Sequence, residues 1–362
     1  MRILRIYWKI PPVSGGMENH IYNLTIEQNK EHSVVVVFNE GEAISPFDIK
    51  IGYIKYNLLK PQSLGIFLFY LNVIWKLVFL NQRFFDVIHI HGDWSSLLLV
   101  RILKRITKAK TVVFSMHGKF SDGKIYSRKM AYLLKNINHV FSTGFETGQK
   151  LITITSKNKV TIQPSGVSKV FYKDKIRDFV NVQNKIITIA NINEKKNIEF
   201  IVELAKRNPN LHFDIVGKGN LENKIKKIAN NEGLTNFKIL GSKSPDDIRL
   251  ILDNSTCFLL TSIEEGTPTV VLEAMTRGLP VITSNVGGIG NIVKNNKNGF
   301  VIDDFSFSLF SEKLNFLNEN QNVRKKIYEL NLRESENFAW DIVANKITSI
   351  TLKKHYESIA RY

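Results

Sequence analysis

The sequence predicts an α/β protein made of two doubly wound domains, on three observations. The chain has 362 residues, whereas a single hydrophobic core stops growing at roughly 250–300 residues. Short apolar strands alternate with helical segments, the pattern of parallel sheets covered by helices on both faces. This alternation stops at a polar stretch and then begins again. We therefore expect a first domain over residues 1–164, a linker over 165–184 and a second domain over 185–340.

The first domain begins with a buried strand over Ile3–Tyr7, after which Gly15 and Gly16 precede a helix from Met17 to about Lys30. Val34–Phe38 is apolar at every position, as in strands buried on both faces of a parallel sheet. Further strands are expected at Val87–His91, Thr111–Met116, Val140–Thr143 and Val160–Gln163, with a helix over Ser95–Lys108. A helical tail over about 341–362 is expected to pack back on this domain.

The second domain repeats the alternation. Its expected strands are Ile186–Ala190, His212–Val216, Phe237–Leu240, Cys257–Thr261 and Val281–Thr283. Its expected helices are Asn197–Arg207, Leu221–Glu232, Pro245–Asp253 and Thr269–Arg277. Two such domains are expected to face each other across a central cleft, because ligands of doubly wound sheets bind at the carboxyl ends of the strands.

Composition excludes several classes of protein. The apolar content of 43% and charged content of 23% exclude disorder and fibrous repeats. The single cysteine, Cys257, excludes a disulfide framework and favours a cytoplasmic location. Charges at Arg2, Arg5 and Lys9 interrupt the N-terminal apolar run, which argues against a signal peptide. A membrane-spanning helix needs about 20 mostly apolar residues, and Gly65–Leu80 is shorter than that. We therefore expect this segment to form a buried or interfacial helix.

Positive charge is concentrated in the first domain. The net charge is +17, and residues 1–164 hold 22 basic but only 10 acidic side chains, which favours an anionic partner. One helix face carries basic residues at i, i+3, i+4 and i+7, namely Arg101, Lys104, Arg105 and Lys108. This face suggests peripheral docking on an anionic inner leaflet, although an ordinary solvated face explains it equally well. Nucleic acid is not an expected partner, because basic stretches interleaved with aromatic residues are absent from the sequence.

Two carboxylates mark the strongest candidate site. Glu265 and Glu273 are separated by seven residues, and a helix is expected to begin between them, near Thr269. Free N–H groups at a helix start suit an anion, and carboxylates accept hydrogen bonds from adjacent sugar hydroxyls. A solvated acidic face is a poor alternative, because Glu273 lies among apolar residues.

Two glycine motifs point to phosphate or nucleotide. Gly15-Gly16 follows a strand and opens a helix, where backbone can approach a phosphate closely; a plain tight turn is the alternative. Gly217-Lys218-Gly219 also lies between a strand and a helix, but Glu222 takes the place of the third glycine of a dinucleotide fingerprint. We therefore expect a turn beside a nucleotide rather than an NAD site.

With these motifs the chain resembles the retaining glycosyltransferases of family 4, which have the GT-B fold. The resemblance rests on EEGTPTVVLEAMTRGLPVITSNVGG, PPVSGGMENHIYNL, IQPSGVSKVF, ANINEKKNIEFIVELAK, DIVGKGNLENKIKKIA and NFAWDIVANKI, which together span most of the chain. It implies transfer of a hexose from a UDP- or GDP-linked sugar to a glycan or lipid-linked acceptor, as in lipopolysaccharide or capsule biosynthesis. It also implies that the first domain binds the acceptor and the second binds the donor.

The resemblance assigns roles to individual residues. Gly15, Gly16 and Lys196 correspond to groups at the donor diphosphate, Glu273 to the ribose ligand, and Glu265 to the contact with the transferred sugar. His117 corresponds to a cleft histidine near that sugar, so His117, Glu265 and Lys196 are the implied catalytic residues. The remaining implied donor-side positions are Asn191, Gly217, Gly241, Ser242, Gly266, Thr267, Pro268 and Thr269. Separately from the resemblance, the residues expected on the acceptor side are His91, Asp93, Trp94 and Lys119.

Three departures from the family pattern stand out. Asn191 occupies the place of an arginine, so one cation facing the diphosphate is missing; Lys195 or Lys218 could compensate. Asn291 takes the place of a glutamate after Gly287-Gly288, and Ser165 and Ser168 replace Asn and Asp in the interdomain turn.

No metal or other cofactor is expected, because no Asp-x-Asp pair suited to a metal occurs in the sequence. His89 and His91 alternate on one strand and, with Asp93 and Trp94, are expected to end at the cleft rim. We favour acceptor contacts or packing for these histidines over metal binding, since a fourth ligand with matching spacing is absent. A nucleotide-sugar epimerase or hydrolase on the same fold is the alternative function, with Glu265 and Glu273 as an acid/base pair.

Overall fold

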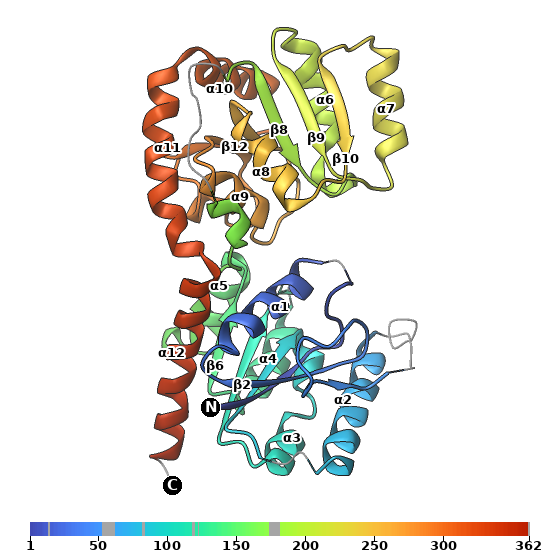
Figure 1. Cartoon of the computed structure of the whole chain (residues 1–362), viewed down its shortest axis with the longest axis vertical. Coiled ribbons are helices and arrows are strands. Elements are labelled where there is room, and N and C mark those ends of the chain that lie inside the picture. The colour runs from blue at the N-terminus through green and yellow to red at the C-terminus, as the bar shows by residue number, and fades with distance from the viewer. Residues whose placement is uncertain are drawn as a thin grey trace. The chain divides into compact units, whose positions relative to one another are not determined.

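The structure is a computed structural model that describes residues 1–13, 15–52, 62–81, 84–117, 120–121, 123–173 and 182–360. The chain divides into two compact units. The first unit contains Met1–Ser165 and Trp340–Tyr362, and the second contains Gly166–Ala339. Figure 1 shows one parallel sheet with flanking helices in each unit.

The first unit is built on a seven-stranded parallel sheet with the order β3-β2-β1-β4-β5-β6-β7. The strands are β1 (Arg2–Ile6), β2 (Ser33–Phe38), β3 (Ile49–Lys50), β4 (Val87–Gly92), β5 (Thr111–Met116), β6 (His139–Ser142) and β7 (Val160–Ile162). All six strands expected here are confirmed to within one residue. The two-residue β3 was missed because it is too short to carry a pattern.

Helices cover both faces of this sheet. They are α1 (Gly16–Gln28), α2 (Gln62–Phe79), α3 (Val100–Thr107), α4 (Lys124–Leu134), α5 (Phe145–Ile154) and α12 (Trp340–Ile359). One face buries side chains of α2, α3, α4 and α5. The other buries α1 and α12, whose Trp340, Val343 and Ile347 join Ile3 and Ile21 in one apolar cluster.

The helix expected over Ser95–Lys108 is wrong in part. A short 3-10 helix covers Trp94–Leu97, and α3 begins only at Val100. Asp93 caps the first segment by accepting a hydrogen bond from the backbone N–H of Ser95 at 2.9 Å. The apolar periodicity continues across the break, so the pattern could not separate the two segments.

The second unit is built on a six-stranded parallel sheet with the order β10-β9-β8-β11-β12-β13. The strands are β8 (Lys185–Ile189), β9 (His212–Val216), β10 (Phe237–Gly241), β11 (Cys257–Leu260), β12 (Val281–Ser284) and β13 (Gly299–Ile302). The helices are α6 (Ile198–Arg207), α7 (Glu222–Asn231), α8 (Pro245–Asp253), α9 (Thr269–Thr276), α10 (Phe307–Glu319) and α11 (Gln321–Ser335). The five strands and four helices expected here are confirmed to within one residue, whereas β13, α10 and α11 were not foreseen.

A membrane-crossing segment is absent from the helices that the structure describes, since none combines the necessary length with the necessary apolar character. The expected helix over Gly65–Leu80 forms most of α2 and buries one stripe of side chains, including Phe69, Val73 and Leu77. Its opposite side exposes Trp75 and Phe79 to solvent.

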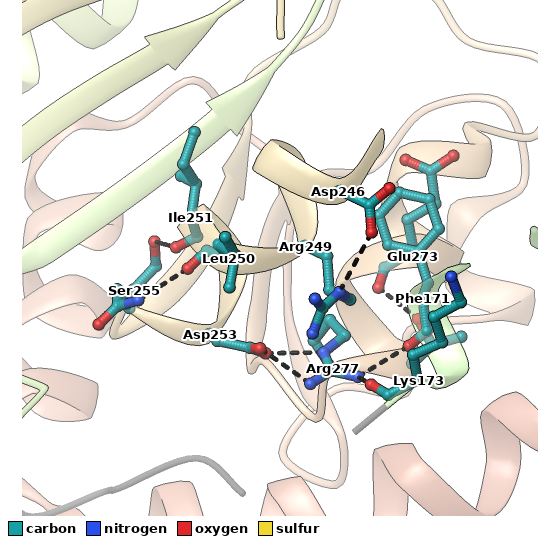
Figure 2. Close-up of polar contacts among 12 residues, drawn as sticks. Phe171, Lys173, Asp246, Arg249, Leu250, Ile251, Asp253, Ser255, Glu273 and Arg277 are labelled. Atoms are coloured by element: carbon teal, nitrogen blue, oxygen red, sulfur yellow. Dashed lines mark hydrogen bonds and ion pairs between the residues drawn. The ribbon is translucent and has the colours of Figure 1, made fainter. Parts of the chain in front are cut away.

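A buried arginine ties the start of the second unit to its helices (Figure 2). Arg277, which follows α9, forms a two-pronged ion pair with Asp253 at the end of α8, with N···O distances of 2.6 and 2.8 Å. The same guanidinium donates to the backbone carbonyls of Phe171 and Lys173 at 2.9 and 2.7 Å. Arg277 therefore joins three segments that lie far apart in the sequence.

Replacing Arg277 with methionine should destabilise the protein by about 3 kcal/mol, because Asp253 and two carbonyls lose their buried partner. Urea unfolding followed by circular dichroism measures this free energy. Arg207→Met is the matched control, because Arg207 makes an exposed ion pair with Glu203 on α6 and should cost less than about 1 kcal/mol. Equal losses for the two variants would contradict this account of Arg277.

Candidate functional site

Loops after three neighbouring strands meet in the second unit, at the carboxyl ends of β8, β11 and β12. The hydroxyl of Thr261 donates to the carbonyl of Lys196 at 3.3 Å. The backbone N–H of Ile263 donates to the carbonyl of Lys195 at 2.8 Å. Ser284 at the end of β12 donates to the carbonyl of Ser262 at 2.6 Å. The three loops are therefore held together by direct hydrogen bonds, at the sheet edge where doubly wound folds bind ligands.

Lys196 and Glu265 form an ion pair between the first two of these loops. Their side chains are only 20% and 8% exposed. The Glu265 carboxylate also accepts a hydrogen bond from the hydroxyl of Ser262 at 2.6 Å. Two residues assigned to the donor by the resemblance thus lie in contact, and Ser262 was missed because nothing in its local sequence marks it.

Two glycines allow these loops to pack so closely. At Gly287, where φ is +61°, an added Cβ would lie 2.3 Å from the carbonyl oxygen of Glu265. At Gly217, where φ is +141°, it would lie 1.9 Å from the carbonyl oxygen of Ala190. Any side chain at either position would therefore displace a loop of the site. The second glycine of the Gly-Lys-Gly motif, Gly219, would meet the carbonyl of Ile192 in the same way.

Glu273 lies on α9, one helix turn past the loop that holds Glu265. Burial raises the pKa of its carboxyl group from 4.5 to about 7. Among the residues that the structure describes, no cation or hydrogen-bond donor contacts this carboxylate, whereas its backbone carbonyl accepts from Thr276 at 2.7 Å. An unpaired buried carboxylate is costly in the charged form, so a ligand that donates hydrogen bonds to it would be favoured.

The other residues expected on the donor side also belong to the second unit and lie in its loops or at the ends of its strands and helices. Asn191, which stands where the family has an arginine, is exposed, as are Lys218, Ser242 and Gly266. Gly241 ends β10 with φ of +72°. Thr267 and Pro268 precede α9, and Thr269 is its first residue. Lys195 pairs with Glu264 at 3.2 Å on the surface.

In the first unit, His117 follows β5 and contacts His91 at the end of β4. The Nε2 atom of His117 lies 3.0 Å from the Nδ1 atom of His91. Burial lowers the pKa of His117 to about 3 and holds the pKa of His91 well below its ordinary value. Both imidazoles are therefore neutral at physiological pH.

His20, on α1, completes a three-histidine cluster with His91 and His117. Its ring lies 4.6 Å from the His117 ring between centroids, edge to face. Its Nδ1 atom lies 2.8 Å from the hydroxyl of Ser165. The sequence alone could not bring His20 to His91, because the two residues are 71 positions apart.

His89 is not at a rim, which corrects the expectation from its alternation with His91. It is 2% exposed and lies between the hydroxyl of Ser115 at 2.8 Å and the guanidinium of Arg5 at 3.5 Å. Arg5 is itself fully buried on β1 and donates to Thr25 on α1. Burial lowers the pKa of Arg5 to about 9.

The remaining first-unit residues have more ordinary surroundings. Asp93 is occupied as a helix cap through Ser95, and Trp94 is covered by the ammonium of Lys129 at 3.3 Å from the ring centroid. Gly15 immediately precedes α1, and an added Cβ on Gly16 would meet nothing within 4 Å. Lys119 lies outside the described residues. A cavity of about 240 Å³ opens beside His91 and Asp93, with walls from Tyr7, Trp8 and Phe69.

The pKa of Glu273 predicts how stability depends on pH. The folded protein keeps this proton up to about pH 7, whereas an ordinary carboxyl group releases it near pH 4.5. This group therefore destabilises the fold as pH rises from about 4.5 to above 7, by up to about 3 kcal/mol. Glu273→Gln should remove that loss, so its stability relative to the wild type should increase over this range.

Urea unfolding at several pH values measures this difference. Glu264→Gln is the matched control, because Glu264 lies on the neighbouring loop with a side chain 44% exposed and solvent screens its charge. A pH-independent difference between wild type and Glu273→Gln would contradict the assignment.

Comparisons with known proteins agree with this architecture. Residues 173–331 match the family model described as "Glycosyl transferases group 1", and residues 14–169 match that described as "Glycosyltransferase Family 4". A human phosphatidylinositol N-acetylglucosaminyltransferase subunit is 25% identical over 305 residues, which cover 79% of this chain but only 62% of that protein. The UDP-Gal:alpha-D-GlcNAc-diphosphoundecaprenol alpha-1,3-galactosyltransferase of Escherichia coli is 26% identical over 81% of this chain and 82% of its own length.

Among solved structures, Anabaena Alr3699/HepE in complex with UDP is similar with a TM-score of 0.78 and 17% identity, over 96% of this chain and 99% of that chain. This similarity shows the GT-B fold, in agreement with the two parallel sheets. Two glycosyltransferase models match consecutive parts of the sequence, and together they span most of it. The chain therefore has the GT-B fold, with a first part that matches the family 4 glycosyltransferase model and a second part that matches the group 1 glycosyl transferase model.

Proposed function

We propose that this glycosyltransferase uses a UDP- or GDP-linked sugar and transfers it, with retention of configuration, to a glycan or lipid-linked acceptor of a cell-envelope polysaccharide. The observation that carries the proposal is the half-buried Lys196 paired with the carboxylate of Glu265, together with the carboxylate of Glu273 on the next helix, which no cation or donor among the described residues contacts. The ammonium group of Lys196 would pair with a diphosphate, and the carboxylate of Glu273 would accept hydrogen bonds from the two hydroxyl groups of a ribose. The Escherichia coli relative is named as a UDP-Gal transferase, and the Anabaena structure holds UDP, which supports a nucleotide-sugar donor.

In the proposed donor complex, the ammonium of Lys196 turns from Glu265 to the diphosphate. The N–H groups at the start of α9, from Thr269 and Val270, add a second positive region. Glu273 accepts hydrogen bonds from the ribose hydroxyls, and Glu265, once released from Lys196, accepts from the transferred sugar. Gly217, Gly241 and Ser242 border the base and ribose.

The proposed chemistry follows from where charge develops. The bond from the anomeric carbon to the diphosphate oxygen breaks, and a bond from that carbon to the acceptor oxygen forms on the same face. The acceptor proton passes to the leaving phosphate oxygen. Lys196 and the α9 N–H groups stabilise the negative charge on the leaving group. No metal is required in this scheme, and His117 contacts the sugar as a neutral imidazole.

A nucleotide-sugar hydrolase or epimerase is the second candidate that the carboxylate pair raised. The relatives named above are transferases, so they do not favour a hydrolase or an epimerase. Acceptor-independent release of free sugar, without transfer to any glycan, would favour it over transfer. A stable glycosyl adduct on Glu265 would contradict the proposed direct displacement.

We also propose that the first unit docks on an anionic membrane surface from the cytoplasmic side. The solvent-exposed side of α2 presents Leu71, Trp75 and Phe79, of which Trp75 and Phe79 are 61% and 70% exposed. The adjacent α3 packs against α2 and exposes Arg101 and Arg105. Apolar side chains beside basic ones are the composition of an interfacial membrane contact. A lipid-linked acceptor would then be reached at the membrane surface.

Binding to nucleotides tests the donor proposal. We expect UDP or GDP, or one of their hexoses, to raise the melting temperature in excess chelator, because a ligand bound only by the folded state stabilises it. Lys196→Met should lower turnover by roughly 10²–10³-fold, and Glu273→Gln should weaken nucleotide binding. Lys206→Met is the control, since Lys206 pairs with Glu232 on the surface of the same unit. No shift with any nucleotide, or turnover that is lost in chelator, would contradict the proposal.

Vesicle flotation tests the membrane proposal. The protein should float with vesicles rich in acidic lipid at low salt and dissociate as salt screens the charges. Replacing Arg101 and Arg105 with glutamine should weaken binding by about tenfold or more, at about 1 kcal/mol per charge. Lys206→Gln with Arg207→Gln removes the same charge from the second unit and should have little effect. Equal recovery with neutral and acidic vesicles would contradict the docking proposal.

A further inference from the structure

The three-histidine cluster of the first unit has nitrogen atoms that its surroundings leave unused. Within the described part of the chain, the Nε2 atoms of His20 and His91 are buried and have no hydrogen-bond partner. Both residues are 1% exposed. Buried polar atoms without partners are rare, because each costs free energy that folding must offset. The unpartnered Nε2 of His20, which lies beside two further imidazoles, calls for a ligand that accepts a nitrogen lone pair.

The geometry fits a metal ion. One ring nitrogen from each of His20, His91 and His117 can be chosen so that all three lie within 4.8 Å of one another. Ligands of tetrahedral Zn²⁺ at about 2.0–2.1 Å lie about 3.4 Å apart. The Nδ1 atom of His91 and the Nε2 atom of His117 are 3.0 Å apart and share a hydrogen bond. A metal ion bound by both atoms would replace that bond, and the unpartnered Nε2 of His20 would be its third ligand. Rotations that move each nitrogen by less than about 1 Å would therefore complete the set.

A hydroxyl group is placed to orient the third ligand. Ser165 lies 2.8 Å from Nδ1 of His20, and acceptance of the Nδ1–H by this hydroxyl would leave the lone pair on Nε2, the unpartnered atom. Metal-bound histidines are usually held in this way through their second nitrogen.

We propose that His20, His91 and His117 form a binding site for one divalent transition-metal ion of the Zn²⁺ class. Three neutral imidazoles suit Zn²⁺, Co²⁺ or Cu²⁺, whereas Mg²⁺ and Ca²⁺ require oxygen ligands. The buried charge of Arg5, which reaches the cluster through His89, opposes a cation and should keep the affinity moderate. A bound ion would also occupy a nitrogen of His117, so it should inhibit sugar transfer; this consequence alone rests on the proposed function.

Cobalt absorption spectroscopy on the full chain tests the site without donor or acceptor. After removal of metals by chelator, Co²⁺ should bind in a 1:1 ratio and give the visible bands of a four-coordinate ion, and Zn²⁺ should displace it. His20→Gln and His91→Gln should each weaken binding by at least about tenfold, and Ser165→Ala by roughly tenfold. His32→Gln is the control, because His32 lies in the same unit, outside the cluster, near the N-terminal amine.

The outcomes separate the two claims. The site would be overturned if adding Co²⁺ to the wild type gave no absorption bands of a four-coordinate ion. It would also be overturned if His20→Gln and Ser165→Ala bound Co²⁺ as tightly as His32→Gln. Should the histidine variants not fold, Ser165→Ala carries the test by itself. Turnover that Zn²⁺ inhibits and chelator restores would support the consequence for His117. Turnover unaffected by saturating Zn²⁺ would overturn that consequence but leave the spectroscopic result intact.

Discussion

The ion pair between Lys196 and Glu265 is the interaction on which the second unit's site depends. A largely buried ammonium group requires an anion nearby, because desolvation of an unpaired charge is costly. Glu265 provides that anion and, in doing so, links the loop after β8 to the loop after β11. In the proposed donor complex, a ligand anion would take the place of this carboxylate at the lysine. The loops are thus arranged before a ligand arrives, which reduces the ordering that binding would require.

Much of the fold could be predicted because parallel sheets use long apolar strands. Val34–Phe38 and Cys257–Leu260 have no polar position, so their assignment needed no tertiary information. The segmentation of Ser95–Lys108 could not be predicted, because the break depends on the Asp93 cap and not on the apolar periodicity. The two-residue β3 is too short to carry a pattern. The late helices α10 and α11 were also missed, although Phe310, Leu314 and Leu317 of α10 recur at helical spacing.

The candidate site could be predicted in part. The Glu265–Glu273 spacing located a loop and the start of a helix, and α9 does begin at Thr269. The contact between Lys196 and Glu265 could not be foreseen, because it joins positions 69 residues apart. Asn197, with φ of +52°, ends the short turn that presents this lysine, and such a backbone state is not evident from one asparagine. The histidine cluster was hidden for the same reason, since α1, β4 and the β5 loop meet only through the sheet order.

The return of α12 to the first unit has a consequence for biosynthesis. The sheet face formed by Ile3, Val34 and Val36 is covered in part by Trp340, Val343 and Ile347, which are synthesised after the whole second unit. Throughout translation of the second unit, this apolar face of the nascent chain lacks its final cover. The first unit is then completed only after the second has been synthesised, and chaperones that shield exposed apolar surface have a defined stretch of the nascent chain on which to act.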